Sequence, residues 1–201
     1  IGGMIANNSS GTKSILYGKT GDHVIELKVM LADGTILYTK ALSPDELQDK
    51  LSGTDNDRIY YQKMMDIVLP LNKEISEKYP KTMRRVAGYA FDDFITSGFA
   101  DLNRILIGSE GTLGVILEAK LKLVRLPKYK GLSVVQFDHA HDAIRATRTM
   151  VKYNPSAVEI LSKLLLGYSR KNIETAPMCG FLKGDPDSIQ IIEFYGDNPD
   201  V

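Results

Sequence analysis

Residues 108–114 read Gly108-Ser109-Glu110-Gly111-Thr112-Leu113-Gly114 and lead directly into the segment 115–123. Apolar residues occupy every second position of that segment, which predicts a strand. A second glycine-rich stretch, Ile1-Gly2-Gly3-Met4-Ile5-Ala6-Asn7-Asn8-Ser9-Ser10-Gly11, precedes another alternating segment at 24–31. Glycine lets the main chain approach a ligand closely and lets successive N–H groups converge on an anion. Either stretch alone is more simply a tight turn, but the two together favour a backbone site for phosphate or for the polar edge of a ring.

The first 127 residues read as strands and helices of one domain. Residues 1–22 are expected to be mostly loop, and 24–31 and 35–39 to form a hairpin. Ser43 is a predicted helix cap, and a longer helix ends before Pro80. The segment 81–97 has no clear period. Three sets of apolar residues are each predicted to share one face of their element, on the first strand, the long helix and the strand after Gly114: Ile25, Leu27, Val29 and Leu31; Tyr60, Met64, Ile67, Leu71 and Ile75; Val115, Leu117, Ala119, Leu121 and Leu123.

The composition changes near 128–131, which indicates a linker. Beyond it, strands are predicted at 132–137, 156–161 and 189–195, and helices at 140–153 and up to about residue 171. Ile144, Thr147 and Val151 should face inward from the first of these helices. The order strand-helix-strand-helix-strand with short connections predicts the start of a separate α+β domain at 131–201.

Composition limits the classes of function. Of the 201 residues, 43% are hydrophobic and 25% are charged, as in ordinary globular proteins. Basic and acidic residues balance at 25 each, so no overall field favours nucleic acid. No apolar run approaches the ~20 residues of a membrane span. Cys179 is the only cysteine, which excludes an internal disulfide and fits a reducing compartment. We therefore expect a cytoplasmic protein without a nucleic-acid partner or membrane span, with peripheral attachment to the inner membrane as an alternative.

The common nucleotide-binding signatures are not met. The spacing Gly108-x-x-Gly111-x-x-Gly114 differs from the G-x-G-x-x-G of dinucleotide folds. Gly18-Lys19-Thr20 imitates the end of a P-loop, but Lys13 stands where the first glycine of that loop belongs. Neither a Rossmann dehydrogenase nor a P-loop NTPase is supported.

Several motifs together resemble a known family. They are the stretch 1–11, the stretch Tyr17–Val24, the turn Ala32-Asp33-Gly34 and the stretch Gly108–Ile116. In this order and spacing they resemble the vanillyl-alcohol-oxidase-type (PCMH-type) FAD-binding domain. Within it, the stretches 85–92, 155–159 and 193–197 are similar to the D-lactate, glycolate and D-2-hydroxyglutarate dehydrogenase branch, including large members with a C-terminal iron–sulfur region.

The resemblance implies a fold and an activity. Residues 1–127 would be the second subdomain of the FAD-binding domain, a mostly antiparallel sheet with helices, and 131–201 would begin a ferredoxin-like α+β substrate or cap domain. The family oxidises small D-2-hydroxy acids by hydride transfer to flavin, and the electrons then pass to an acceptor protein or quinone. An oxidase or ether-lipid-synthase type of relative, and a non-catalytic domain that has lost FAD, are the alternatives.

The chain opens on Ile1 inside a motif, so we expect a longer parent. The first FAD subdomain should precede Ile1 and the distal cap should follow Val201, so the fragment alone should be inactive. An iron–sulfur cluster would lie elsewhere in the parent chain.

The resemblance assigns cofactor contacts residue by residue, but no catalytic residue and no metal ligand. The expected FAD-binding residues are Gly2, Gly3, Ala6, Asn7, Asn8, Gly11, Glu110, Gly111, Gly114, Val115 and Ile116. Glu110 is expected to be a buried carboxylate bonded to loop N–H groups rather than a catalytic acid. His139 and His141 have the spacing of metal ligands, but their place at a helix start favours a surface or capping role.

Overall fold

A computed structural model describes residues 1–96 and 98–198. The chain divides into two compact units, which are considered separately. The first comprises Ile1–Ser10 and Gly18–Val124, and the second comprises Gly11–Tyr17 and the residues from Arg125 onward. Among the described residues, no helix is long and apolar enough to cross a membrane.

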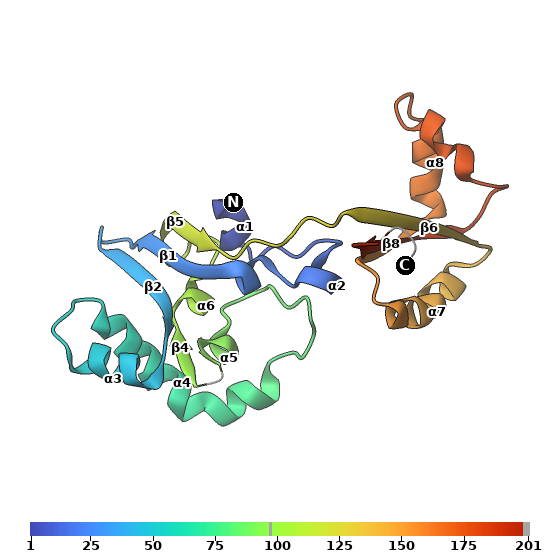
Figure 1. The fold of residues 1–201 in the computed structure, drawn as a ribbon. Coiled ribbons are helices and arrows are strands. Elements are labelled where there is room, and N and C mark those ends of the chain that lie inside the picture. Colours follow the sequence, from blue (N-terminus) through green and yellow to red (C-terminus); the bar gives the residue numbers. More distant parts are fainter. Residues whose placement is uncertain (97, 199–201) are drawn as a thin grey trace. The chain divides into compact units, whose positions relative to one another are not determined.

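The first unit is built on an antiparallel sheet of five strands in the order β3-β4-β2-β1-β5. Figure 1 shows β1 between β2 and β5, with α1 beside β5. The strands are β1 (Val24–Met30), β2 (Ile36–Leu42), β3 (Ile95–Thr96), β4 (Phe99–Asp101) and β5 (Val115–Leu121). The helices are α1 (Gly2–Ala6), η1 (Thr20–His23), α3 (Pro44–Ser52), α4 (Arg58–Lys78), α5 (Phe91–Phe94) and α6 (Asn103–Leu106).

Most of the predicted elements of this unit are present. The hairpin β1–β2 and the strand β5 are confirmed, and Ser43 is the N-cap of α3, where it forms a capping box with Glu46. The expectation of a loop over residues 1–22 is wrong in part, because the helices α1, α2 (Ser14–Tyr17) and η1 occupy much of it. The short elements α5, β3 and β4 were not predicted, since two to four residues carry no readable period.

Two register shifts in the β1–β5 pair alter which residues are buried. One lies between Val24 and Glu26, so Val24 joins Leu27 and Val29 in the core while Ile25 is 43% exposed. The other pairs Lys28 with Glu118 but Val29 with Ile116, which leaves Leu117 as an extra residue. A bulge of this kind reverses the alternation beyond it. The prediction that the apolar residues of β1, and those of β5, share one face is therefore wrong at Ile25, Val115 and Leu117.

The long helix α4 buries a different face from the one predicted. Tyr61, Val68 and Ile75 are buried, whereas Ile67 and Leu71 are exposed. The buried residues repeat every seven positions and pack with Leu42, Phe94 and Ile105 in one core cluster. The predicted stripe was correct at Ile75, and Tyr60 and Met64 also pack against this cluster. It was wrong at Ile67 and Leu71, because the unpredicted elements β4 and α5 determine which side of α4 is covered.

A buried polar group connects α6 to the sheet. The Asn103 side chain is fully buried, accepts from Thr39 Oγ1 at 2.6 Å and donates to Ile25 O at 3.2 Å. The Asn103 N–H donates to Asp101 Oδ1 at 3.0 Å. Burial raises the pKa of Asp101, and the hydrogen bond from Asn103 opposes that rise. The oxygen and the nitrogen of the Asn103 side chain therefore both have hydrogen-bond partners inside the protein.

The second unit is an antiparallel sheet in the order β6-β8-β7. Its elements are α2 (Ser14–Tyr17), β6 (Tyr129–Phe137), α7 (Ala140–Met150), η2 (Val151–Tyr153), β7 (Ala157–Ser162), α8 (Lys163–Lys171), η3 (Ala176–Phe181) and β8 (Ser188–Gly196). The predicted element order is confirmed, and the chain as a whole is α+β with antiparallel sheets.

Helix α7 packs on this sheet through small and polar residues. Ala143 is buried, and Thr147 accepts a hydrogen bond from Gln190 Nε2 at 2.8 Å. Ile144 and Val151 are exposed, so their predicted inward positions are wrong. The cap of α7 is Asp187, whose Oδ2 accepts from Ala140 N at 2.8 Å, and no side-chain cap bond comes from His139.

We predict that Asn103→Ala lowers the free energy of unfolding by about 2 kcal/mol, because Ile25 O loses its partner in a buried setting and Thr39 loses its acceptor. Urea unfolding followed by circular dichroism measures the change. The control is Asn56→Ala, at an exposed position between α3 and α4, which should change the value by less than about 0.5 kcal/mol. Equal effects of the two substitutions would contradict the prediction.

Candidate functional site

The two glycine-rich stretches are joined by their main chains. Gly108 N donates to Ile5 O at 3.0 Å, and Glu110 N donates to Ala6 O at 2.8 Å. The side chain of Ile5 is fully buried in a core cluster with Leu27 and Val29 of β1. The last turn of α1 is thus fastened both to the sheet and to the second stretch. Segments a hundred residues apart in sequence form one surface of the first unit.

Asn8 ends α1 in a left-handed conformation. Its φ is +48°, and the bonds Ser9 N to Met4 O (2.9 Å) and Asn8 N to Ile5 O (3.0 Å) form a Schellman motif. Asparagine is one of the few residues besides glycine that adopts this conformation readily. Asn7, by contrast, has a φ of −103°. Of these two adjacent asparagines, Asn8 alone has a left-handed backbone.

The Asn8 side chain turns into the protein. Its Oδ1 accepts from Gly21 N at 2.9 Å. A Cβ on Gly108 would lie 3.4 Å from Asn8 Cβ, and one on Gly21 would lie 2.9 Å from Asn8 Oδ1. Asn8 is therefore buried between η1 and the second glycine-rich stretch. A glycine stands at position 21 because the Asn8 side chain occupies the space where a Cβ would lie.

A third segment, the connection between α4 and α5, lies beside Gly108 and Thr112 of the second glycine-rich stretch. The carbonyl oxygen of Val86 would lie 3.6 Å from a Cβ on Gly108. The hydroxyl groups of Tyr89 and Thr112 lie 2.7 Å apart. Sequence reasoning noted this segment for its family likeness alone and assigned no site role to Tyr89, Thr112 or Gly21, because contacts across the fold leave no local pattern in a single sequence.

The exposed backbone of these stretches fits a flat or phosphate-bearing cofactor. Gly2, Gly3 and Gly111 of the first unit have no neighbouring atom within 4 Å of where a Cβ would lie, so their main chains border open space. The Ser10 hydroxyl oxygen is buried without a hydrogen-bond partner in the described part of the chain. Main-chain donors and a small hydroxyl are the groups that recognise pyrophosphate and the polar edge of a flavin. The residues present fit FAD.

Not every predicted site residue borders this open space. A Cβ on Gly114 would lie 2.7 Å from Met30 O and 2.8 Å from Val29 Cγ1, so close packing on β1 explains this glycine. Ile116 packs against the core cluster, while Val115 is exposed. Gly11 falls in the second unit, where its N–H donates to Ser14 Oγ at 2.9 Å.

The expectation for Glu110 is wrong. Its side chain is exposed to solvent rather than buried. Glu110 contributes to the structure of this turn through its main chain instead: its N–H donates to Ala6 O, and its φ is +52°.

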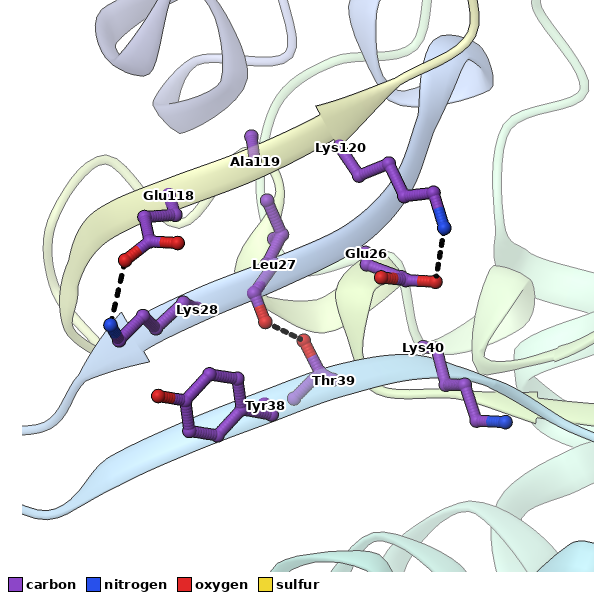
Figure 2. Close-up of a pocket in the computed structure, with 9 residues that line it drawn as sticks. All are labelled: Glu26, Leu27, Lys28, Tyr38, Thr39, Lys40, Glu118, Ala119 and Lys120. Carbon is purple, nitrogen blue, oxygen red and sulfur yellow. Dashed lines mark hydrogen bonds and ion pairs between the residues drawn. The ribbon is translucent and has the colours of Figure 1, made fainter.

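A separate pocket of about 330 Å³ lies over β1, β2 and β5. Figure 2 shows its charged side chains paired across the strands, Lys28 with Glu118 at 2.6 Å and Lys120 with Glu26 at 2.9 Å. The hydrogen bond to Glu118 raises the pKa of Lys28. These charges neutralise one another at an exposed surface, so this pocket offers a ligand little beyond solvated ion pairs.

A charged cleft of about 420 Å³ lies near η1 and the segment 80–93. Arg85 pairs with Asp92 through two contacts of 2.7 Å, and Arg104 lies 3.5 Å from Asp22. Lys19 Nζ donates to Arg85 O at 3.3 Å. These bonds hold the segment against the first unit. Within the described residues, no cluster of His, Cys, Asp and Glu side chains could hold a metal ion.

Comparison with known proteins agrees with this geometry. The family model "FAD binding domain" matches residues 1–40. D-2-hydroxyglutarate dehydrogenase of Escherichia coli (strain K12) is 37% identical over 98% of this chain. The resemblance to the PCMH-type FAD-binding family is therefore confirmed. The relatives in this comparison are named as D-2-hydroxyglutarate and D-lactate dehydrogenases.

More distant members of the family cover less of the chain. The mitochondrial D-lactate dehydrogenase [cytochrome] of Arabidopsis thaliana is 28% identical over 90% of it. The chain spans about a fifth of the length of the curated relatives it matches, 20% for the Escherichia coli protein and 24% for the Arabidopsis protein. Among solved structures, an alkyldihydroxyacetonephosphate synthase has a similar fold, with a TM-score of 0.52 at 17% identity, covering 97% of this chain and 29% of that protein.

We predict that Gly114→Ala destabilises the fold by about 1–3 kcal/mol, because the added methyl group would overlap the β1 main chain. Thermal unfolding of the purified protein measures the effect. Gly2→Ala is the matched control, since open space surrounds that position and no loss of stability is expected. An unchanged melting temperature for Gly114→Ala would contradict the packing described.

Proposed function

We propose that the joined glycine-rich stretches bind FAD in a flavoprotein that oxidises a small D-2-hydroxy acid of the lactate, glycolate or 2-hydroxyglutarate type. The observation that carries the proposal is the pair of main-chain bonds, Gly108 N to Ile5 O and Glu110 N to Ala6 O. They bring the two stretches of exposed glycine backbone into one surface. When bound, FAD would accept the hydride from the substrate carbon.

The chain's own residues would bind and orient the cofactor. Gly2, Gly3 and Gly111 border open space and would allow close approach of the main chain. Ala6 would hold the two stretches in register through the bond from Glu110 N, and Asn8 would hold the end of α1 against η1 through the bond from Gly21 N. The remaining assigned contacts, Asn7, Gly11, Glu110, Gly114, Val115 and Ile116, belong to the same proposal, largely through main-chain atoms.

We also propose the domain assignment. Residues 1–127 would form the second subdomain of the FAD-binding domain, and 131–201 would begin a ferredoxin-like substrate or cap domain. The five-stranded sheet of the first unit and the order β6-α7-β7-α8-β8 in the second support this division. Electrons would leave the flavin for an acceptor protein or quinone, in a cytoplasmic protein or one held peripherally at the inner membrane.

Two alternatives are less well supported. An oxidase or ether-lipid-synthase chemistry would use the same fold, but the relatives with higher identity are named as dehydrogenases. A domain that has lost FAD would have no reason to keep bare glycine backbone at Gly3.

The direct test is the purified full-length protein that carries this chain. We expect bound FAD, and bleaching of its visible absorption on anaerobic addition of D-lactate or D-2-hydroxyglutarate but not of their L enantiomers. A full-length protein that takes up no FAD when it is supplied would overturn the proposal. Rapid reoxidation by oxygen alone would instead indicate an oxidase.

The variant Gly3→Ala separates cofactor binding from stability. Alanine favours the helical conformation of α1 over glycine by about 0.5–1 kcal/mol, so the fold should be unharmed or slightly stabilised. The added methyl group would enter the open space proposed for FAD, and we predict that the dissociation constant of FAD rises about tenfold, equivalent to about 1.4 kcal/mol. Fluorescence titration of the apoprotein with FAD gives this constant.

Ala32→Gly, at an exposed turn position outside the site, is the control and should leave FAD affinity unchanged. The prediction fails if Gly3→Ala binds FAD as tightly as the unaltered protein.

A further inference from the structure

The turn at Ser109–Thr112 has an unfavourable backbone. Glu110 and Gly111 both have positive φ values, +52° and +79°, and Thr112 N donates to Ser109 O at 3.0 Å. This is the pattern of a type I′ turn, whose first central position favours Asn, Asp or Gly. A glutamate there is disfavoured, because its Cβ crowds the main chain in the left-handed region. The turn therefore depends on contacts from outside itself.

One of these contacts comes from Tyr89. The Thr112 hydroxyl donates to Ser109 O at 2.6 Å, which uses its single hydrogen. Its oxygen lies 2.7 Å from the Tyr89 hydroxyl, so the phenol is the donor and Thr112 the acceptor. The result is a chain of two hydrogen bonds, from Tyr89 through Thr112 to the carbonyl group that closes the turn.

Tyr89 is itself held on the other side. Its carbonyl oxygen accepts from Tyr79 OH at 2.9 Å, and Tyr79 is the residue at which α4 ends. The Arg85 guanidinium lies 4.9 Å from the centre of the Tyr79 ring and pairs with Asp92. The Tyr89 ring also packs at a tilt against Phe91, 6.1 Å between centres. These contacts connect α4 with the exposed turn.

We infer that Tyr89 is a positioning residue for the flavin cofactor, acting through Thr112 to hold the Glu110–Gly111 turn in the conformation that meets FAD. The inference rests on the proposed FAD site. The Gly111 N–H makes no hydrogen bond with the described residues, and a Cβ there would meet open space. The tip of the turn is thus bare main chain, and its direction is set by the Tyr89–Thr112 contact.

A merely structural role predicts a different outcome from a positioning role. The Tyr89–Thr112 bond lies at the surface, so its loss should alter the melting temperature little. A turn released from Tyr89 would present its main chain to the cofactor in several conformations. FAD affinity and the circular dichroism of the bound flavin would then change while the fold persists.

The experiment uses the full-length protein with the substitutions Tyr89→Phe, Thr112→Val and Thr112→Ser. We expect FAD dissociation constants about tenfold higher for Tyr89→Phe and Thr112→Val, with altered visible circular dichroism of the flavin. Thr112→Ser keeps the hydroxyl group and should restore the unaltered values. The double variant Tyr89→Phe/Thr112→Val should be no weaker than Thr112→Val alone, because both substitutions break the same bond.

The control is Tyr153→Phe, at an exposed tyrosine of the second unit, which should change neither quantity. FAD binding by Tyr89→Phe equal to that of the unaltered protein would overturn the inference and leave the proposed function standing. So would losses that multiply in the double variant. An unaltered protein that binds no FAD would overturn both.

Discussion

Two main-chain hydrogen bonds, from Gly108 to Ile5 and from Glu110 to Ala6, connect the start of the chain to the turn before β5. Each contributes about 1 kcal/mol on its own, but their geometric effect is larger. Because Ile5 is buried against Leu27 and Val29, the bonds relate both exposed stretches to the rigid centre of the sheet. The proposed cofactor surface depends on this connection.

The connection is built from backbone conformations that most residues avoid. Asn8, Gly108, Glu110 and Gly111 all have positive φ values. At Asn8, a Schellman motif and the bond from the Gly21 N–H stabilise the left-handed backbone. At Glu110, the bond to Ala6 and the bonds within the turn stabilise it. Left-handed residues that the rest of a fold must stabilise are often found where a protein binds a ligand. Here Glu110 and Gly111 lie at the exposed turn, whereas Asn8 and Gly108 are buried.

Different physical reasons explain why glycine stands at particular positions of the two stretches and of η1. Gly114 and Gly21 are glycines because protein atoms occupy the adjacent space, at Met30 and Asn8 respectively. Gly2, Gly3 and Gly111 have open space instead. A motif that looks uniform in sequence therefore combines packing positions with positions that have no packing explanation, and only the second group favours a ligand. A single sequence does not separate the two groups, since the distinction lies in atoms from β1 and η1.

The sequence by itself determined the α+β class, the order of the longer strands and helices in both units, and the two glycine-rich stretches as the place to look for a site. These follow from local periodicity, helix capping at Ser43 and backbone freedom at glycine, all of which act over a few residues. Only the tertiary structure decided that Ile25, Val115 and Leu117 are exposed, because a bulge depends on the partner strand. The tertiary structure also decided that the Glu110 side chain is exposed to solvent and that Tyr89 contacts Thr112. Tyr89 and Thr112 lie on segments that carry no trace of one another in the sequence.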